Sequence, residues 1–391
     1  MEPQPAPDRL ADDDSAGVTG VTGVIVAAPP VGRRRRLAST AGALLAVGLL
    51  AGCGVRLEAP PESEPVPDSL ELVRRTAVSD ALRVADGAEA ALEEVPRARE
   101  RVVAELTRIA AASREQADAL GGEYDSGLAT DAPTDPPSTT WDRATPADVV
   151  EALDDAAARS RTAAGTTTDG PLARLLASVG AAQTVSGERL AALADVPGPD
   201  VATPRVPTPT GDGRPEADTS TPDAATEEPT TDPDGTGPEG GDDGTVPEGL
   251  TPQDLSTLVV SEDATRYALQ LRAAIGAGET RERLLERVAV HGQRADAWAA
   301  VAGVQATADD PRRAAYAVPR AADQGDKALV LDLEDDLATD YATLVGTTAA
   351  GTRTVLVDLL VDAAVTLDDW GAEPEPFPGL PEQAGDEAPA A

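Results

Sequence analysis

Cysteine, histidine and aromatic residues are scarce in this chain of 391 residues, which has one cysteine, one histidine and one phenylalanine. One cysteine cannot form an internal disulfide, and without a second cysteine there is no dithiol for redox chemistry. With a single histidine no Ser–His–Asp arrangement is credible, and no glycine-rich phosphate loop follows a strand pattern. We therefore expect no enzyme and no cofactor.

Basic residues are also few, because 32 Lys and Arg stand against 69 Asp and Glu and give a formal net charge of −37. Nucleic-acid binders gain affinity when Lys and Arg neutralise phosphates, so this balance excludes a nucleic-acid partner. The same charge keeps the chain off anionic lipid headgroups unless a covalent group holds it there. Since aromatic residues make up only 2%, Ala, Leu and Val must build the core, which favours an all-α fold.

A short apolar segment has the features of a lipoprotein signal peptide, predicted over residues 33–52. Arg33–Arg36 form a cationic start, and Leu37–Leu50 form an apolar run too short for a membrane span. The run ends in Leu50-Ala51-Gly52-Cys53, which matches the lipobox pattern. We expect cleavage before Cys53 and a lipid on its sulfur, which would hold the protein on the outer face of the cytoplasmic membrane. The alternative for the segment is a short buried helix, and both Sec and twin-arginine export stay open.

Changes in composition divide the rest of the chain. Residues 1–32 are either a disordered leader or precede a true start near Val31, and residues 53–67 are a Pro/Glu tether. Residues 197–249 have almost no large apolar side chains to offset the entropy of ordering, so they predict a disordered acidic linker. This linker separates two segments of helical periodicity, 68–196 and 250–381, and residues 382–391 are predicted to be a disordered tail.

The segment 68–196 predicts four amphipathic helices. An apolar stripe from Leu70 to Ala85 marks the first, and a restart at Pro96 begins the second, which ends near Leu120. The third runs from an N-cap at Thr145 to about Ala164, and the fourth from about Pro171 to Leu193. Four such helices in this length indicate a small bundle.

The segment 250–381 repeats the pattern. Thr251-Pro252-Gln253-Asp254 opens a first helix in the same way as the sequence at Thr145. Further helices are predicted over Glu279–Val304, Lys327–Val345 and Arg353–Trp370, and Phe377-Pro378-Gly379-Leu380 closes the domain as a hydrophobic clasp. The mature protein is thus predicted to consist of two four-helix bundles joined by one acidic linker.

Several residues in this second segment carry a family resemblance: Glu262, Tyr267, the stretch His291-Gly-Gln-Arg294-Ala-Asp296, Tyr316-Ala-Val-Pro319, Tyr341, Trp370 and Phe377-Pro-Gly-Leu380. In this order they resemble an uncharacterised ferritin-like domain family of secreted and lipidated proteins from high-GC Gram-positive bacteria. The resemblance covers about Leu255 to Pro381, and the first segment looks like a more diverged relative. It implies two ferritin-like bundles, but no activity, since ferritin-like bundles serve many functions.

A ferritin-like di-iron site needs a Glu from each of two helices and a Glu-x-x-His from each of the other two. Here His291 is the one histidine, and the nearest preceding glutamate, Glu286, is five residues away, so we expect no metal. The acids at equivalent depths are Glu262, Glu334, Asp340, Asp358 and Asp362, which are either solvated acids or a carboxylate-rich site for a hard cation. His291 either pairs with Glu262 across the bundle or is a satisfied core or surface histidine.

Two functions follow from these patterns. The first is a membrane-anchored surface lipoprotein whose helical bundles act as a non-catalytic interaction or scaffold module for an envelope protein partner. The alternative is metal or small-ligand binding by the second bundle through Glu262 and His291, with or without enzymatic activity.

The lipidation of Cys53 predicts the behaviour of a Cys53→Ser variant. Because the chain is too acidic to approach a membrane by charge, we expect this variant to lose membrane retention and labelling by a lipid analogue. Cell fractionation with metabolic lipid labelling measures both. A Cys53→Ser protein that still fractionates fully with membranes would contradict the prediction.

Overall fold

The computed structural model describes residues 66–126, 141–201, 203–207 and 246–383. All regular secondary structure within these ranges is helical, which confirms the predicted all-α class. The predicted signal peptide, with Leu50, Ala51, Gly52 and Cys53, lies outside the described residues, as does most of the predicted linker. None of the described helices is long and apolar enough to cross a membrane.

The described residues form eight α-helices in two sets of four. The N-terminal helix set consists of α2 (Ser69–Glu94), α3 (Glu100–Ala119), α4 (Pro146–Thr166) and α5 (Gly170–Ala194). The C-terminal helix set consists of α6 (Pro252–Ile275), α7 (Gly278–Val301), α8 (Asp326–Thr347) and α9 (Thr354–Asp369). Two short 3-10 turns, η1 (Arg320–Gln324) and η2 (Pro381–Gln383), belong to the C-terminal connections. The predicted helix over Glu279–Val304 ends earlier than expected, at Val301.

The predicted helix starts at Thr145 and Thr251 are confirmed in atomic detail. Each threonine is the N-cap of its helix, a proline follows, and an aspartate in the first turn completes a capping box. In α6, the Asp254 backbone N–H donates to Thr251 Oγ1 at 3.1 Å, and the Asp254 carboxylate accepts from the Thr251 backbone N–H at 2.8 Å. Both boxes satisfy N–H groups that a helix start otherwise leaves unpaired.

A glycine inside α2 makes room for one of the three tryptophans. The ring of Trp141, in the loop before α4, lies so close to Gly87 that a Cβ there would come within 3.0 Å of the indole. The indole Nε1 donates to the carbonyl of Arg83 at 3.0 Å. Gly87 thus lowers helix propensity but lets Trp141 pack across the N-terminal helix set.

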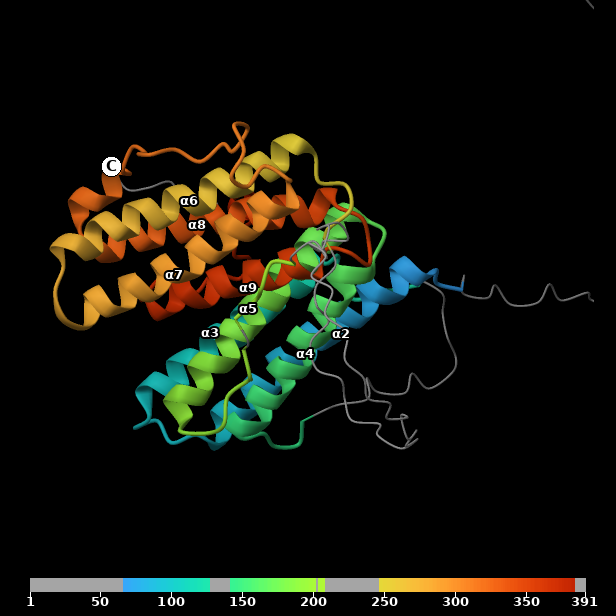
Figure 1. The fold of residues 1–391 in the computed structure, drawn as a ribbon. Coiled ribbons are helices and arrows are strands. Elements are labelled where there is room, and N and C mark those ends of the chain that lie inside the picture. Colours follow the sequence, from blue (N-terminus) through green and yellow to red (C-terminus); the bar gives the residue numbers. More distant parts are fainter. Residues whose placement is uncertain (1–65, 127–140, 202, 208–245, 384–391) are drawn as a thin grey trace, which may run out of the picture. The chain divides into compact units, whose positions relative to one another are not determined.

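The two helix sets share one hydrophobic core. Figure 1 shows α5 and α9 side by side, and buried residues of α5 such as Leu176 and Ala181 belong to the same cluster as Leu337 of α8 and Leu360 of α9. The described residues therefore do not show two separate bundles. The reason is that α5 buries residues around its whole circumference, and a helix that is apolar on all sides must be covered on all sides.

Parts of the predicted linker also pack against the helices. Val206 is 8% exposed and belongs to the shared core. Near the other end, the Glu248 carbonyl accepts from the Ala349 N–H at 2.8 Å, and the Glu248 N–H donates to Thr352 Oγ1 at 2.9 Å. The segments at 197–207 and 246–249, as far as the structure describes them, are thus attached to the helices rather than free.

The clasp after α9 fastens the two helix sets together. Phe377 and Leu380 are buried, as predicted, and the Ser178 hydroxyl of α5 donates to the Pro378 carbonyl at 2.8 Å. Gly379 has φ of +76°, and a Cβ there would lie 2.6 Å from the Ala338 carbonyl oxygen of α8. A glycine is therefore required where the clasp lies directly on a helix backbone.

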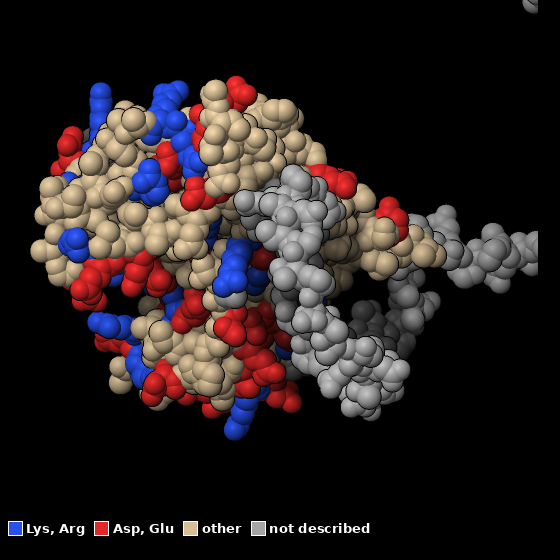
Figure 2. Space-filling view, viewed as in Figure 1, with Lys and Arg blue, Asp and Glu red and all other residues tan. Residues whose placement is uncertain are grey.

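Ion pairs at the edge of the shared core join the same helices. Arg161 of α4 pairs with Asp358 of α9 at 2.7 Å, and Arg189 of α5 pairs with Asp368 of α9 at 2.5 Å. Figure 2 shows acidic and basic side chains interspersed over one face of the molecule. Despite the net negative charge, many of the arginines therefore have acidic neighbours.

Two glycines lie where α5 meets α8, and we expect their replacement by alanine to have different effects. A Cβ on Gly170, the first residue of α5, would overlap the carbonyl oxygen of Gly346 in α8, whereas a Cβ on Gly346 would find ordinary contacts from 3.5 Å outward. We expect Gly170→Ala to lower the free energy of unfolding by about 1–3 kcal/mol, the usual cost of overpacking. Gly346→Ala, the matched control, should be neutral or stabilising because alanine favours the helix. Urea unfolding followed by circular dichroism measures both; equal effects would contradict the shared core.

Candidate functional site

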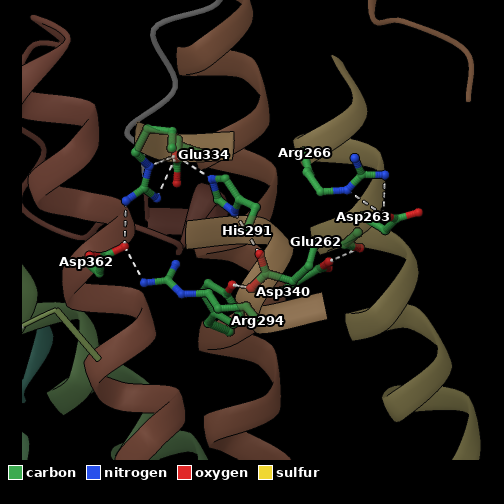
Figure 3. A network of polar contacts seen from close by, with 11 residues as sticks. Glu262, Asp263, Arg266, His291, Arg294, Glu334, Asp340 and Asp362 are labelled. Atoms are coloured by element: carbon green, nitrogen blue, oxygen red, sulfur yellow. Dashed lines mark hydrogen bonds and ion pairs between the residues drawn. The ribbon is translucent and has the colours of Figure 1, made fainter. Parts of the chain in front are cut away.

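A histidine buried at the centre of the C-terminal helix set lies between two buried glutamates. His291 of α7 is 0% exposed, as is Glu262 of α6, and Glu334 of α8 is 1% exposed. The His291 Nδ1 is 2.7 Å from Glu262 Oε2, and its Nε2 is 3.1 Å from Glu334 Oε1. Figure 3 shows the ring between the two carboxylates. His291 thus contacts Glu262 across the bundle and is at the same time a core histidine with both ring nitrogens partnered.

Two arginines of α7 complete this cluster. Arg287 Nη2 lies 2.8 Å from Glu334 Oε1, and its Nη1 donates to Asp362 Oδ2 of α9 at 3.1 Å. Arg294 Nη2 donates to the same Asp362 oxygen at 2.7 Å. We call Glu262, Arg287, His291, Arg294, Glu334 and Asp362 the buried charge network. Residues from all four helices of the set thus meet at one place.

The spacing along α7 explains why its three cations converge. Arg287, His291 and Arg294 stand at i, i+4 and i+7, so they lie on one face of the helix. The apolar residues Leu284 and Trp298, both fully buried, lie on the same stripe. The sequence pattern contained this signal, but arginines are ordinarily assigned to a solvated face, so Arg287 was not among the predicted site residues.

A tyrosine binds the carboxylate oxygen of Glu262 that does not face His291. The fully buried Tyr341 hydroxyl donates to Glu262 Oε1, while Glu262 Oε2 faces His291. Burial, together with the nearby negative charge of Glu262, raises the pKa of Tyr341 well above its ordinary value, so its hydroxyl stays a donor. Tyr341 therefore holds this carboxylate in the rotamer that His291 requires.

The network is electrically balanced when His291 is protonated. Burial alone would lower the pKa of His291, but the charge of Glu334 and hydrogen bonds to Glu262 and Glu334 raise it above 6.5 overall. Both ring nitrogens face carboxylates, and only an imidazolium donates from both. Burial would raise the pKa of Glu334, yet Arg287 and His291 lower it to about 2. Three carboxylates then face two guanidinium groups and one imidazolium.

The free polar atoms of the network are mostly donors. Arg287 Nη2, Arg294 Nε and Arg294 Nη1 are buried without a hydrogen-bond partner among the described residues, and Glu334 Oε2 is the one such carboxylate oxygen in the network. A metal ion needs several acceptor atoms directed at one point. Within the described part of the chain, no group of three or more His, Cys, Asp and Glu side chains could hold a metal ion. The free polar atoms of the network, most of them N–H groups, therefore do not fit a metal site.

The other predicted carboxylates lie outside the network. Asp340 accepts from the Ser261 hydroxyl at 3.1 Å, and burial, despite that hydrogen bond, raises the pKa of Asp340. Asp358 pairs with Arg161 in the N-terminal helix set. Of the five acids singled out in the sequence, three therefore meet around α7 and two have structural roles elsewhere.

A second contact group ties the crossover between α7 and α8 to α6. The Tyr316 hydroxyl donates to Asp263 at 2.8 Å, and Arg266 also donates to Asp263 at 2.8 Å. The rings of Tyr316 and Tyr267 meet edge to face with centroids 5.8 Å apart. These aromatics therefore act as a structural clamp on the crossover rather than as ligands of the network.

One end of the network reaches a small polar pocket of about 260 Å³. Arg287 and Asp362, which are 12% and 13% exposed, contribute to its wall. Arg283 lies there with its guanidinium 4.1 Å from the ring centroid of Trp370. Solvent thus approaches the arginine end of the network, whereas the histidine end is closed.

A comparison with known families matches part of the chain. Residues 255–382 match the family described as "Domain of unknown function (DUF4439)". This range contains the whole buried charge network and the clasp, and it agrees with the predicted extent of the resemblance, about Leu255 to Pro381. No curated protein and no solved structure matches the chain.

Because of this network, we expect the free energy of unfolding to fall both at high pH and at low pH. Because the folded pKa of His291 is raised, its contribution is complete below pH 6.5 and is lost as pH rises through the folded value. Because the pKa of Glu334 is lowered from 4.5 to about 2, its contribution is present above pH 4.5 and is lost as pH falls toward 2. We expect the two contributions to coexist between pH 4.5 and 6.5, which urea unfolding across a pH series measures.

The control is His291→Gln. Removing one member of a buried ionic cluster costs about 3–5 kcal/mol, so the variant should be less stable at every pH. It should also lose the decline that the wild-type chain shows above pH 6.5, since the titrating group is gone. An unchanged decline in the variant would refute the assignment to His291.

Proposed function

We propose that this protein is a membrane-anchored surface lipoprotein whose ferritin-like helical domain is a non-catalytic interaction or scaffold module of the cell envelope. The observation that carries the proposal is the pairing of Arg287 and Arg294 with the acids of α8 and α9 at the centre of the C-terminal helix set. In a metalloenzyme of this class, carboxylates at the centre of the bundle bind the metal ions. Here guanidinium groups pair with the central carboxylates instead.

The ferritin-like interpretation rests on which positions face inward. A di-metal bundle of this class directs carboxylates and histidines from four helices to one centre. Here Glu262, His291, Glu334 and Asp362 come from α6, α7, α8 and α9 in turn and converge in the same manner. However, the position three residues before His291 is Val288 rather than glutamate. The convergence of these four side chains supports the ferritin-like proposal, and their charges are satisfied internally.

The same network argues against acid–base catalysis. A general base must come within hydrogen-bond reach of a substrate proton. His291 is 0% exposed, and both its ring nitrogens already face carboxylates. Its raised pKa also favours the imidazolium, which is not a base.

The lipobox at Leu50-Ala51-Gly52-Cys53 supports the membrane address of the proposal. A lipid on Cys53 would connect the first described helix, α2, to the membrane through the short tether predicted over residues 53–67. The shared core then makes both helix sets one packed unit on that tether, so that a partner would meet them together.

Metal analysis of the purified, unlipidated full-length protein tests the proposal. We expect no stoichiometric iron, manganese or zinc after growth or reconstitution with each metal, and an unfolding midpoint that chelator does not change. The matched variants are Glu262→Ala and His291→Ala, measured with the wild-type protein. Stoichiometric metal that is lost in both variants would overturn the non-catalytic proposal and favour metal or ligand binding by these two residues.

A further inference from the structure

A largely apolar cavity lies where the two helix sets meet. It has a volume of about 450 Å³ and is bordered by α5, α8, α9 and the segment that leads from α9 to the clasp. This volume lies within the range of pockets that bind small organic molecules, about 300–1,000 Å³. No residue of the buried charge network lines it.

The inner wall of the cavity is apolar. Val185 of α5, Leu331 of α8, and Ala364 and Leu367 of α9 line it, and Pro374 covers one side. Such a wall favours an apolar body, because burying hydrocarbon surface stabilises binding by about 25 cal/mol per Å². The wall alone, however, does not choose between neutral and charged ligands.

The charged residues of the cavity are all acidic. Asp332, Asp335, Glu373 and Glu375 line it, and among the described residues none of these four carboxylates has an ion pair or hydrogen bond with a cation. The fifth, Asp368, is already paired with Arg189. Acids elsewhere, such as Asp80, Glu105 and Asp326, have arginine partners, whereas these four do not.

The pKa values of two of these acids, Asp335 and Glu375, are raised. Asp335 is an exposed residue, and its partial burial raises its pKa, with the charges of Asp336 and Asp332 raising it further. Burial likewise raises the pKa of Glu375, with a further contribution from Asp335. A positive charge placed between Asp335 and Glu375 would relieve this repulsion, whereas an anion would increase it.

We propose that this cavity binds an amphipathic organic cation, with its apolar body against α5, α8 and α9 and its ammonium or amidinium group between Asp335 and Glu375. The proposal goes beyond the non-catalytic role proposed above and does not rest on it, since the cavity and the network share no residue. Charge complementarity selects a cation, and the apolar wall selects an organic one over a metal ion.

Three probes with the same eight-carbon chain test the proposal on the full-length protein by isothermal titration calorimetry. Octylammonium should bind, octanol should bind at least about tenfold more weakly, and octanoate should give no binding, because only the cation is complementary to the acids. Equal affinities for octylammonium and octanol would overturn the proposal, because the cavity would then recognise only the chain.

Variants locate the binding. Asp335→Asn combined with Glu375→Gln should weaken octylammonium binding about tenfold and leave octanol unchanged. The matched control, Glu151→Gln combined with Asp154→Asn on the exposed face of α4, removes the same charge and should leave octylammonium affinity unchanged. Ala328→Leu, which narrows the cavity, should weaken both probes. Unchanged octylammonium affinity in the Asp335 and Glu375 double variant would refute the site.

Folding of the double variant can be checked independently. Because Asp335 and Glu375 repel each other, their neutralisation should leave the unfolding midpoint unchanged or raise it. A folded double variant that binds octylammonium as the wild type does would therefore be decisive against the proposal, and one that has lost binding would support it.

Discussion

The buried ion pairs of α7 are the constraint on which the C-terminal helix set depends. Taking three carboxylates and three cations out of water costs several kcal/mol for each ion, and only close pairing offsets that cost. Each of α6, α8 and α9 supplies one acid, and α7 supplies all three cations. If any of the four helices slipped by one residue, a buried charge would lose its partner. The network therefore specifies one register for the whole set.

This register extends to the N-terminal helix set through α9 and the clasp. Asp358 and Asp368 of α9 pair with arginines of α4 and α5. Ser178 of α5 holds the clasp by its backbone. Because residues at both ends of the linker also pack on the helices, the linker does not set the distance between the two sets. Any bound partner would therefore contact a single packed unit. Two separate bundles would instead offer two surfaces at different distances from the membrane.

The helices themselves were predictable, because apolar spacing and capping residues are local signals. Thr145 and Thr251 begin their helices as predicted. The shared core was not predicted, because packing between distant segments leaves no local pattern. The continuous apolar circumference of α5 was the one available indication. The pairing of His291 with Glu262 was one of two alternatives, and Arg287 was missed because a basic residue on a core stripe looks like a solvated one.

The most direct measurement of the central claim is the protonation state of His291, the one histidine of the chain, by long-range ¹H–¹⁵N NMR of the full-length protein. If the network is balanced as described, both ring nitrogens carry protons at pH values above 6.5, the ordinary pKa of histidine. The account predicts an imidazolium that persists there and is lost only at higher pH. A neutral imidazole that titrates at or below pH 6.5 would contradict it.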